Sequence, residues 1–217
     1  MTITIDIISS IANGTSVRSW THTNGALVNG VAVVAIMDYG ETQFTTCSAT
    51  FNSVSMGAAL IIQEDDSNVT TAIFALAVGN LAAGGHTVAC TFNGSGATAN
   101  CACWTLNGVS QTSPVRSFKG AHLHGGTAIS LTLDPTVVGD YCICGEANRY
   151  NTSPAPVPAA GQTLDYGPAG TYAAGEFAVA TNVTQAMSWT FPSSTFISIV
   201  AVALAPFIAM YPQIIMY

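Results

Sequence analysis

Hydrophobic and polar residues alternate with a period of two along most of the chain. Successive side chains of a β-strand point to opposite faces, so this alternation predicts strands. Long stretches with the helical period of 3.6 residues are absent from the sequence. The expected strands are residues 2–8, 16–23, 30–39, 58–64, 70–78, 86–92, 98–106, 128–134, 141–147, 176–180, 186–191 and 197–205.

Dipeptides that favour turns lie between these runs, because they adopt positive φ at little steric cost. They are Asn13-Gly14, Asn24-Gly25, Asn29-Gly30, Gly84-Gly85, Asn93-Gly94 and Gly125-Gly126. Without helices to cross between parallel strands, the sheets should be antiparallel. We therefore expect an all-β fold, an antiparallel two-sheet β-sandwich that is jelly-roll-like.

The chain length of 217 residues suits one domain. We expect a single β-sandwich domain over residues 1–207 and an apolar C-terminal arm over residues 208–217. Residues 151–170 hold four of the nine prolines and are predicted to form a surface loop.

Charged residues are scarce, with 4 Lys+Arg, 11 Asp+Glu and a net charge of -7. The four cations are scattered, so they cannot neutralise a run of phosphates, and we expect no nucleic-acid partner. The mean hydropathy of +0.44 leaves little polar surface for a monomer. We therefore expect a homo-oligomer or a protein bound to a larger assembly.

A membrane span is not expected. Residues 196–217 carry no charge, yet Pro206 and Pro212 interrupt them and no Lys or Arg flanks them. The N-terminal sequence MTITIDIISS lacks the basic region of a signal peptide and contains Asp6. We expect assembly in a cytoplasm, where cysteines stay reduced.

Two C-x-C pairs, Cys101/Cys103 and Cys142/Cys144, have strand spacing, which puts both sulfurs of a pair on one face. Structural zinc sites usually use C-x2-C on tight turns, so zinc is the weaker alternative to six free thiols that pack as small hydrophobic groups. Cys47 and Cys90 are interpreted in the same way.

The H-x-H pair His122 and His124 could begin a cupin-type metal site, but Thr127 and Ala128 stand where a third, acidic ligand should follow. We interpret the pair as part of a loop or an interface. The acidic turn from Glu64 to Asn68 could contribute to a calcium site but supplies too few oxygens alone. No catalytic, cofactor-binding or metal-ligating residue is predicted, and the protein is not expected to be an enzyme.

Aromatic residues could stack on sugars. Trp20, Trp104 and Trp189 fall inside strand patterns and are expected in the core. Tyr150, Tyr166 and Tyr172, near the proline-rich segment, are the better candidates for a binding surface.

A series of motifs runs in order from about Ser19 to Phe207. They are SWTHTNGALVNGVAVVAIMDY, FNSVSMGAALIIQ, TAIFALAV, LAAGGHTVACTFNG, WTLNGVSQTSPV and AMSWTFPSSTFISIVAVALAPF. This order resembles a β-sandwich domain of tailed-phage virion structural proteins and predicted bacterial surface proteins. The resemblance implies that LAAGGHTVACTF is a turn feeding an edge strand and that GVSQTSPV follows a core strand. It transfers no catalytic residue, and the cysteine pairs and the C-terminal extension depart from its pattern.

The resemblance and the lack of a catalytic motif favour a structural virion protein, a capsid decoration or cement protein of a tailed bacteriophage. The expected partners are the major capsid protein or other virion proteins, and the expected location is the virion. The alternative is a carbohydrate-binding or adhesive module of a phage-tail or cell-surface assembly, which would bind a glycan.

The apolar C-terminal arm is the predicted partner interface, because burying side chains this apolar is more favourable than leaving them in water. Its residues are Phe207, Ile208, Met210, Tyr211, Ile214, Ile215 and Tyr217.

Overall fold

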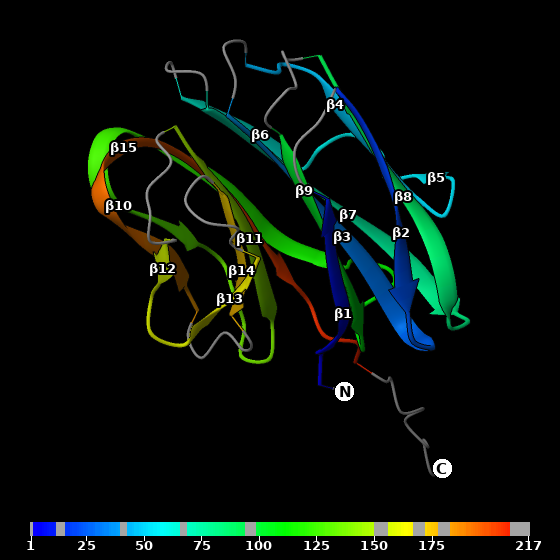
Figure 1. The fold of residues 1–217 in the computed structure, drawn as a ribbon. Helices are drawn as coiled ribbons and strands as arrows, with labels where there is room; N and C mark the ends of the chain where they lie inside the picture. Colours follow the sequence, from blue (N-terminus) through cyan, green and yellow to red (C-terminus); the bar gives the residue numbers. More distant parts are fainter. Residues whose placement is uncertain are drawn as a thin grey trace, which may run out of the picture.

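The computed structural model describes residues 2–11, 16–39, 43–65, 69–93, 99–149, 156–166, 172–177 and 183–208. These residues contain strands and no helix, and the paired strands are antiparallel. The predicted all-β antiparallel sandwich is confirmed, and a third sheet is stacked on it (Figure 1). No helix among the described residues is long and apolar enough to span a membrane.

The middle sheet lies between the other two and is built around a strand with an almost unbroken hydrophobic sequence. Its described strands follow the order β1 (Thr4–Ile11), β9 (Asn100–Asn107), β3 (Leu27–Tyr39), β7 (Val69–Leu81) and β6 (Ile61–Asp65). Both faces of β3 are buried, because Val33 and Ala35 face one neighbouring sheet while Val34 and Ile36 face the other. A strand covered on both sides cannot show simple alternation, which explains its continuous apolar run.

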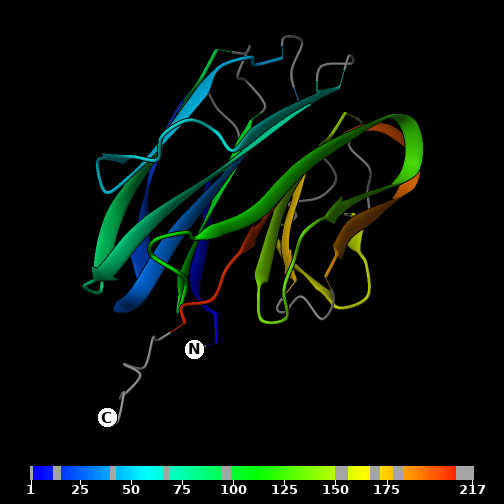
Figure 2. The same ribbon diagram turned by 180° about the vertical axis from the view of Figure 1, so that it is seen from behind.

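The second sheet, here named the long-strand sheet, contains two strands that bend back over their own sheet. Its described strands are β10 (Val115–Leu133), β15 (Gln185–Leu204), β11 (Tyr141–Asn148), β14 (Tyr172–Phe177) and β13 (Gln162–Tyr166), with β12 (Val157–Pro158) paired to β15. The ribbon of β10 and β15 curls at the side of the molecule away from the small sheet (Figures 1 and 2).

The curl encloses a core of its own, in which Leu131, Met187 and Trp189 pack with Cys142 and Ile199. A separate core lies between the middle and long-strand sheets, where Val33 and Met37 meet Ile143 and Val202.

Sequence reasoning divided these long strands too finely. The segment around His122 and His124, interpreted as part of a loop or an interface, belongs to β10, and the expected strands 186–191 and 197–205 are parts of one strand, β15. Gly125 has a φ of +83°, and the register between β10 and β15 shifts beside it, so the ribbon can bend there without breaking. Pro192 falls where β15 has no paired residue on β10, so its missing N–H costs no ladder bond.

The third sheet, the small sheet, has the order β2 (Val17–Asn24), β8 (Gly84–Phe92), β4 (Cys47–Phe51) and β5 (Val54–Ser55) among the described residues. Phe51, Val88 and Phe92 face Val34 and Phe74 of the middle sheet. The expectation that LAAGGHTVACTF feeds an edge strand is wrong, because its strand, β8, lies between β2 and β4. The segment GVSQTSPV does follow a core strand, β9, whose residues are almost all buried.

Candidate functional site

Three of the most exposed apolar side chains of the described chain lie just before β15, just after it, and on the loop between β10 and β11. Val138, Val183 and Ile208 are 69%, 74% and 75% exposed. The N–H of Thr136 donates to Val183 O over 2.7 Å, which holds Val183 against the loop that contains Val138. That loop also adjoins the exit of β15, since a Cβ on Gly139 would lie 3.8 Å from Pro206 Cγ.

A groove of about 830 Å³ opens where β15 leaves the sandwich, and Ile208 is part of its lining. We name it the exit groove; its lining is formed by residues 110–113, Val115, Arg116, Pro135 and residues 205–208. Its volume lies in the range of pockets that hold ligand-sized groups. Val115, Pro135, Phe207 and Ile208 make it apolar, and hydroxyl and amide groups of residues 110–113 add polar contacts.

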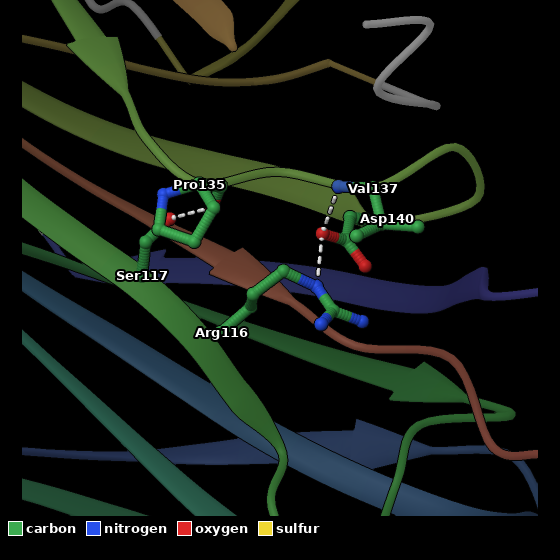
Figure 3. Close-up of polar contacts among 5 residues, drawn as sticks. All are labelled: Arg116, Ser117, Pro135, Val137 and Asp140. Carbon is green, nitrogen blue, oxygen red and sulfur yellow. Dashed lines mark hydrogen bonds and ion pairs between the residues drawn. The ribbon is translucent and has the colours of Figure 1, made fainter. Parts of the chain in front are cut away.

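One wall of the exit groove is fixed by a buried carboxylate (Figure 3). Asp140 Oδ2 accepts from Arg116 Nε at 2.5 Å and from the Val137 N–H at 2.8 Å, while Ser117 Oγ donates to Pro135 O at 2.8 Å. Asp140 is fully buried and pairs with the cation of the lining, so the charge of Arg116 is neutralised at the wall. These contacts join the loop after β10 to the start of the same strand.

The predicted interface residues Phe207 and Ile208 both line the exit groove. Met210, Tyr211, Ile214, Ile215 and Tyr217 lie outside the described residues. Sequence reasoning identified the arm but not the groove, which arises where two loops and the end of β15 meet.

A polar network joins β1 and β2 to β9, which is distant in sequence, at the edge between the middle and small sheets. Trp20 Nε1 donates to Ser9 Oγ at 2.8 Å, and Ser9 Oγ lies 2.6 Å from His22 Nδ1. His22 Nε2 lies 3.0 Å from Thr105 Oγ1, which donates to Asp6 Oδ2 at 3.1 Å.

Only one proton arrangement satisfies this chain of contacts. The Asp6 carboxylate can only accept, so the Thr105 hydroxyl donates its hydrogen to Asp6. Thr105 Oγ1 must then accept from His22 Nε2–H, and His22 Nδ1 accepts from the Ser9 hydroxyl. Burial lowers the pKa of His22 from 6.5 to about 4, with Asp6 opposing the shift and His86 adding to it. So weak a base is poorly matched to activating Ser9 at neutral pH, and the network suits a structural link between two sheets.

The two cysteine pairs have the expected geometry but do not meet. Cys101 and Cys103 both face the core between the middle and small sheets, and Cys142 and Cys144 both face the core inside the curl. The six cysteines, all among the described residues, form no disulfide.

Burial raises the pKa of Cys47, with a contribution from Cys101, and the pKa of Cys142, with a contribution from Asp140, each to about 12. Cys90 and Cys101 come together from the small and middle sheets, which sequence spacing could not show.

His122 and His124 are exposed on β10 and have different neighbours. Gln63 Nε2 donates to His122 Nδ1 at 2.9 Å, and the ring of His124 packs edge-on against Phe196 at 4.3 Å between centroids. Within the described ranges, no three His, Cys, Asp or Glu side chains are grouped to hold a metal ion. Of the acidic turn, Asp66 and residues 67–68 lie outside the described residues.

Among the aromatic candidates, Trp104 and Trp189 are fully buried, as expected, and Trp20 is half-buried. Tyr150 lies outside the described residues, and the backbones of Tyr166 and Tyr172 belong to β13 and β14.

The sequence matches no protein-family model, and no curated protein is significantly similar to it.

Proposed function

We propose that the protein is a structural virion component that works through protein–protein contacts, as a capsid decoration or cement protein of a tailed bacteriophage. The observation that carries the assembly role is the exit groove, whose lining includes the apolar Val115, Pro135, Phe207 and the 75% exposed Ile208, with the exposed Val138 on the loop that adjoins it. Apolar side chains gathered around a groove are typical of interaction surfaces rather than of free monomer surface. The virion setting rests on the ordered series of motifs in the sequence.

The proposed partners are the major capsid protein or another virion protein, together with further copies of this chain. The loop that carries Val138 is held by the Val137 N–H bond to Asp140 Oδ2, and its Thr136 N–H donates to Val183 O, so both side chains can meet a partner with little further ordering. Aspartate at position 138 would have to be desolvated in such a contact and would weaken it.

The test is attachment to purified particles. Wild-type protein should appear at a fixed stoichiometry in purified virions and should rebind particles that lack it. Val138→Asp should lower rebinding at least tenfold, whereas Val54→Asp, on the small sheet at a residue that is 54% exposed, should rebind like wild type. Absence from virions, or glycan binding with no attachment to particles, would overturn the proposal in favour of the adhesive module.

A further inference from the structure

The end of β15 is held in place up to Phe207 by backbone hydrogen bonds. Ala205 N donates to Pro114 O at 2.9 Å, and Ala205 O accepts from Ser110 N at 2.9 Å. Phe207 N donates to Gly108 O at 2.7 Å, and Val109 and Pro206 form an isolated bridge. The position and direction of the chain at Phe207 are therefore set by the sandwich.

Beyond Phe207 the neighbouring residues of β9 already have partners. The residue before Gly108, Asn107, pairs with Thr4 of β1, and its side-chain Oδ1 accepts from Val28 N at 2.8 Å. Leu106 is paired on both sides, with Ile5 and Val31. The chain after Phe207 therefore cannot extend the middle sheet there, and Ile208 is 75% exposed.

The sequence that follows does not favour a reversal onto its own groove. Residues 209–217, AMYPQIIMY, are uncharged and contain no Gly, Asn, Asp or Ser, the residues that form tight turns with Pro. Pro212 also favours an extended backbone before it. Nine extended residues reach about 30 Å, which is enough to cross to a neighbouring molecule.

The exit groove offers these residues a complementary surface. Val115, Pro135 and Phe207 supply apolar contacts for side chains such as Met210 and Tyr211. The arm begins directly after residues that line the same groove. A two-fold related pair of copies would therefore bring two arms and two grooves together, and each arm could enter the other copy's groove.

We propose that the exit groove receives residues 209–217 of a second copy of this chain, so that two copies exchange their C-terminal arms. This inference rests on the proposed assembly function and specifies its self-association. The exchange is closed, since each arm fills one groove and no groove remains to recruit a third copy.

Photo-cross-linking of the full-length protein tests the exchange. A benzophenone amino acid replaces Tyr211 in both a ¹⁴N-labelled and a ¹⁵N-labelled preparation, and equal amounts are mixed, unfolded, refolded together and irradiated. We expect cross-links from position 211 to peptides containing residues 110–116, about half of which join light and heavy chains. Cross-links that are never mixed would show that the arm occupies its own groove, and cross-links elsewhere or none would also overturn the exchange.

A pair of threonine variants gives the matched control. Thr112→Arg places a long charged side chain in the groove and should weaken dimer association at least tenfold in sedimentation experiments. Thr21→Arg makes the same change on an exposed residue of the small sheet and should leave association unchanged. Equal association of both variants with wild type would overturn the exchange.

The outcomes separate this inference from the proposed function. Attachment to virions without mixed cross-links would retain the virion role and reject the exchange. Mixed cross-links in a protein that does not attach to particles would retain the exchange and reject the virion role.

Discussion

His22 illustrates at the scale of one residue how a fold can hold a titratable side chain neutral. Its imidazole is completely buried, and both ring nitrogens contact hydroxyl groups, Ser9 on one side and Thr105 on the other. Protonation would turn Nδ1 into a second donor facing a hydroxyl that already donates to it. Burial also deprives the cation of water, so the pKa falls to about 4.

The first prediction follows from that pKa. Between pH 6.5 and 4 the unfolded chain binds a proton at His22 that the folded protein does not, so the free energy of unfolding falls as the pH falls through this window. At the acid end of this window, His22 should have lowered the free energy of unfolding by about 3 kcal/mol relative to neutral pH. Urea unfolding between pH 7 and pH 4 should show a flatter profile for His22→Gln than for wild type. A His22→Gln protein that retains the full wild-type decrease would show that other groups cause it.

The second prediction concerns Asp140, whose carboxylate joins Arg116 to the backbone of the loop after β10 (Figure 3). Asp140→Ala leaves the Val137 N–H and the Arg116 guanidinium without this partner and should lower the free energy of unfolding by about 2 kcal/mol. Asp140→Asn keeps an acceptor oxygen and the side-chain shape, so it should lose less. The midpoints of urea unfolding measure the stability of both variants. An unchanged midpoint for Asp140→Ala would contradict a stabilising role of this carboxylate.

At the scale of elements, the spacing between β3 and β11 depends on a residue without a side chain. A Cβ on Gly145 would lie 2.9 Å from the Cβ of Ala35 and 3.4 Å from Met37 Cγ. Both neighbours are fully buried in the core between the middle and long-strand sheets, so they have little room to move.

The third prediction is that Gly145→Ala forces these strands apart and lowers the free energy of unfolding by about 1–3 kcal/mol. Gly84→Ala is the matched control, because the nearest atom to its new Cβ would be His86 Nε2 at 3.9 Å, an ordinary contact. Thermal unfolding compares them, and equal melting temperatures would show that the two sheets can separate without cost.

At the scale of the whole molecule, the cores formed by the described residues are built from the chain before the C-terminal arm. The three clusters of buried side chains draw on residues from Ile3 to Leu204. Folding and association should therefore depend on different parts of the chain.

The fourth prediction tests that separation by deleting residues 209–217. The truncated protein should keep the wild-type melting temperature, because it retains the described cores, and should sediment as a monomer where the full chain associates. An unfolded product would show that the arm belongs to the core of its own chain, and a truncated protein that still associates would place the contact elsewhere.

The strands were predictable where a local pattern was enough. Residues 30–39 and 70–78 are apolar and β-branched, and they lie inside β3 and β7. The segment around His122 was not predictable as a strand, because its glycines and polar side chains also suit a loop. Its pairing with β15, more than 70 residues away in sequence, makes it a strand.

For the candidate site, the sequence identified some of the apolar residues but not the contacts that form the groove. Phe207 and Ile208 stood out as apolar residues at the end of a strand pattern, whereas Arg116 and Asp140, which fix the groove wall, carry no local signal. The network of Asp6, His22 and Thr105 was also invisible, since its members come from three strands.

The sequence by itself determined that the protein is all-β and antiparallel and that its last residues are apolar, because alternation, turn dipeptides and composition are properties of neighbouring residues. Only the tertiary structure decided that three sheets are stacked, that β10 and β15 curl around a core of their own, and that a groove opens where β15 leaves. These features depend on which distant strands pair and on how closely residues such as Gly145 and Ala35 approach. Contacts between distant residues are chosen by the packing of the whole chain, which no short stretch of sequence contains.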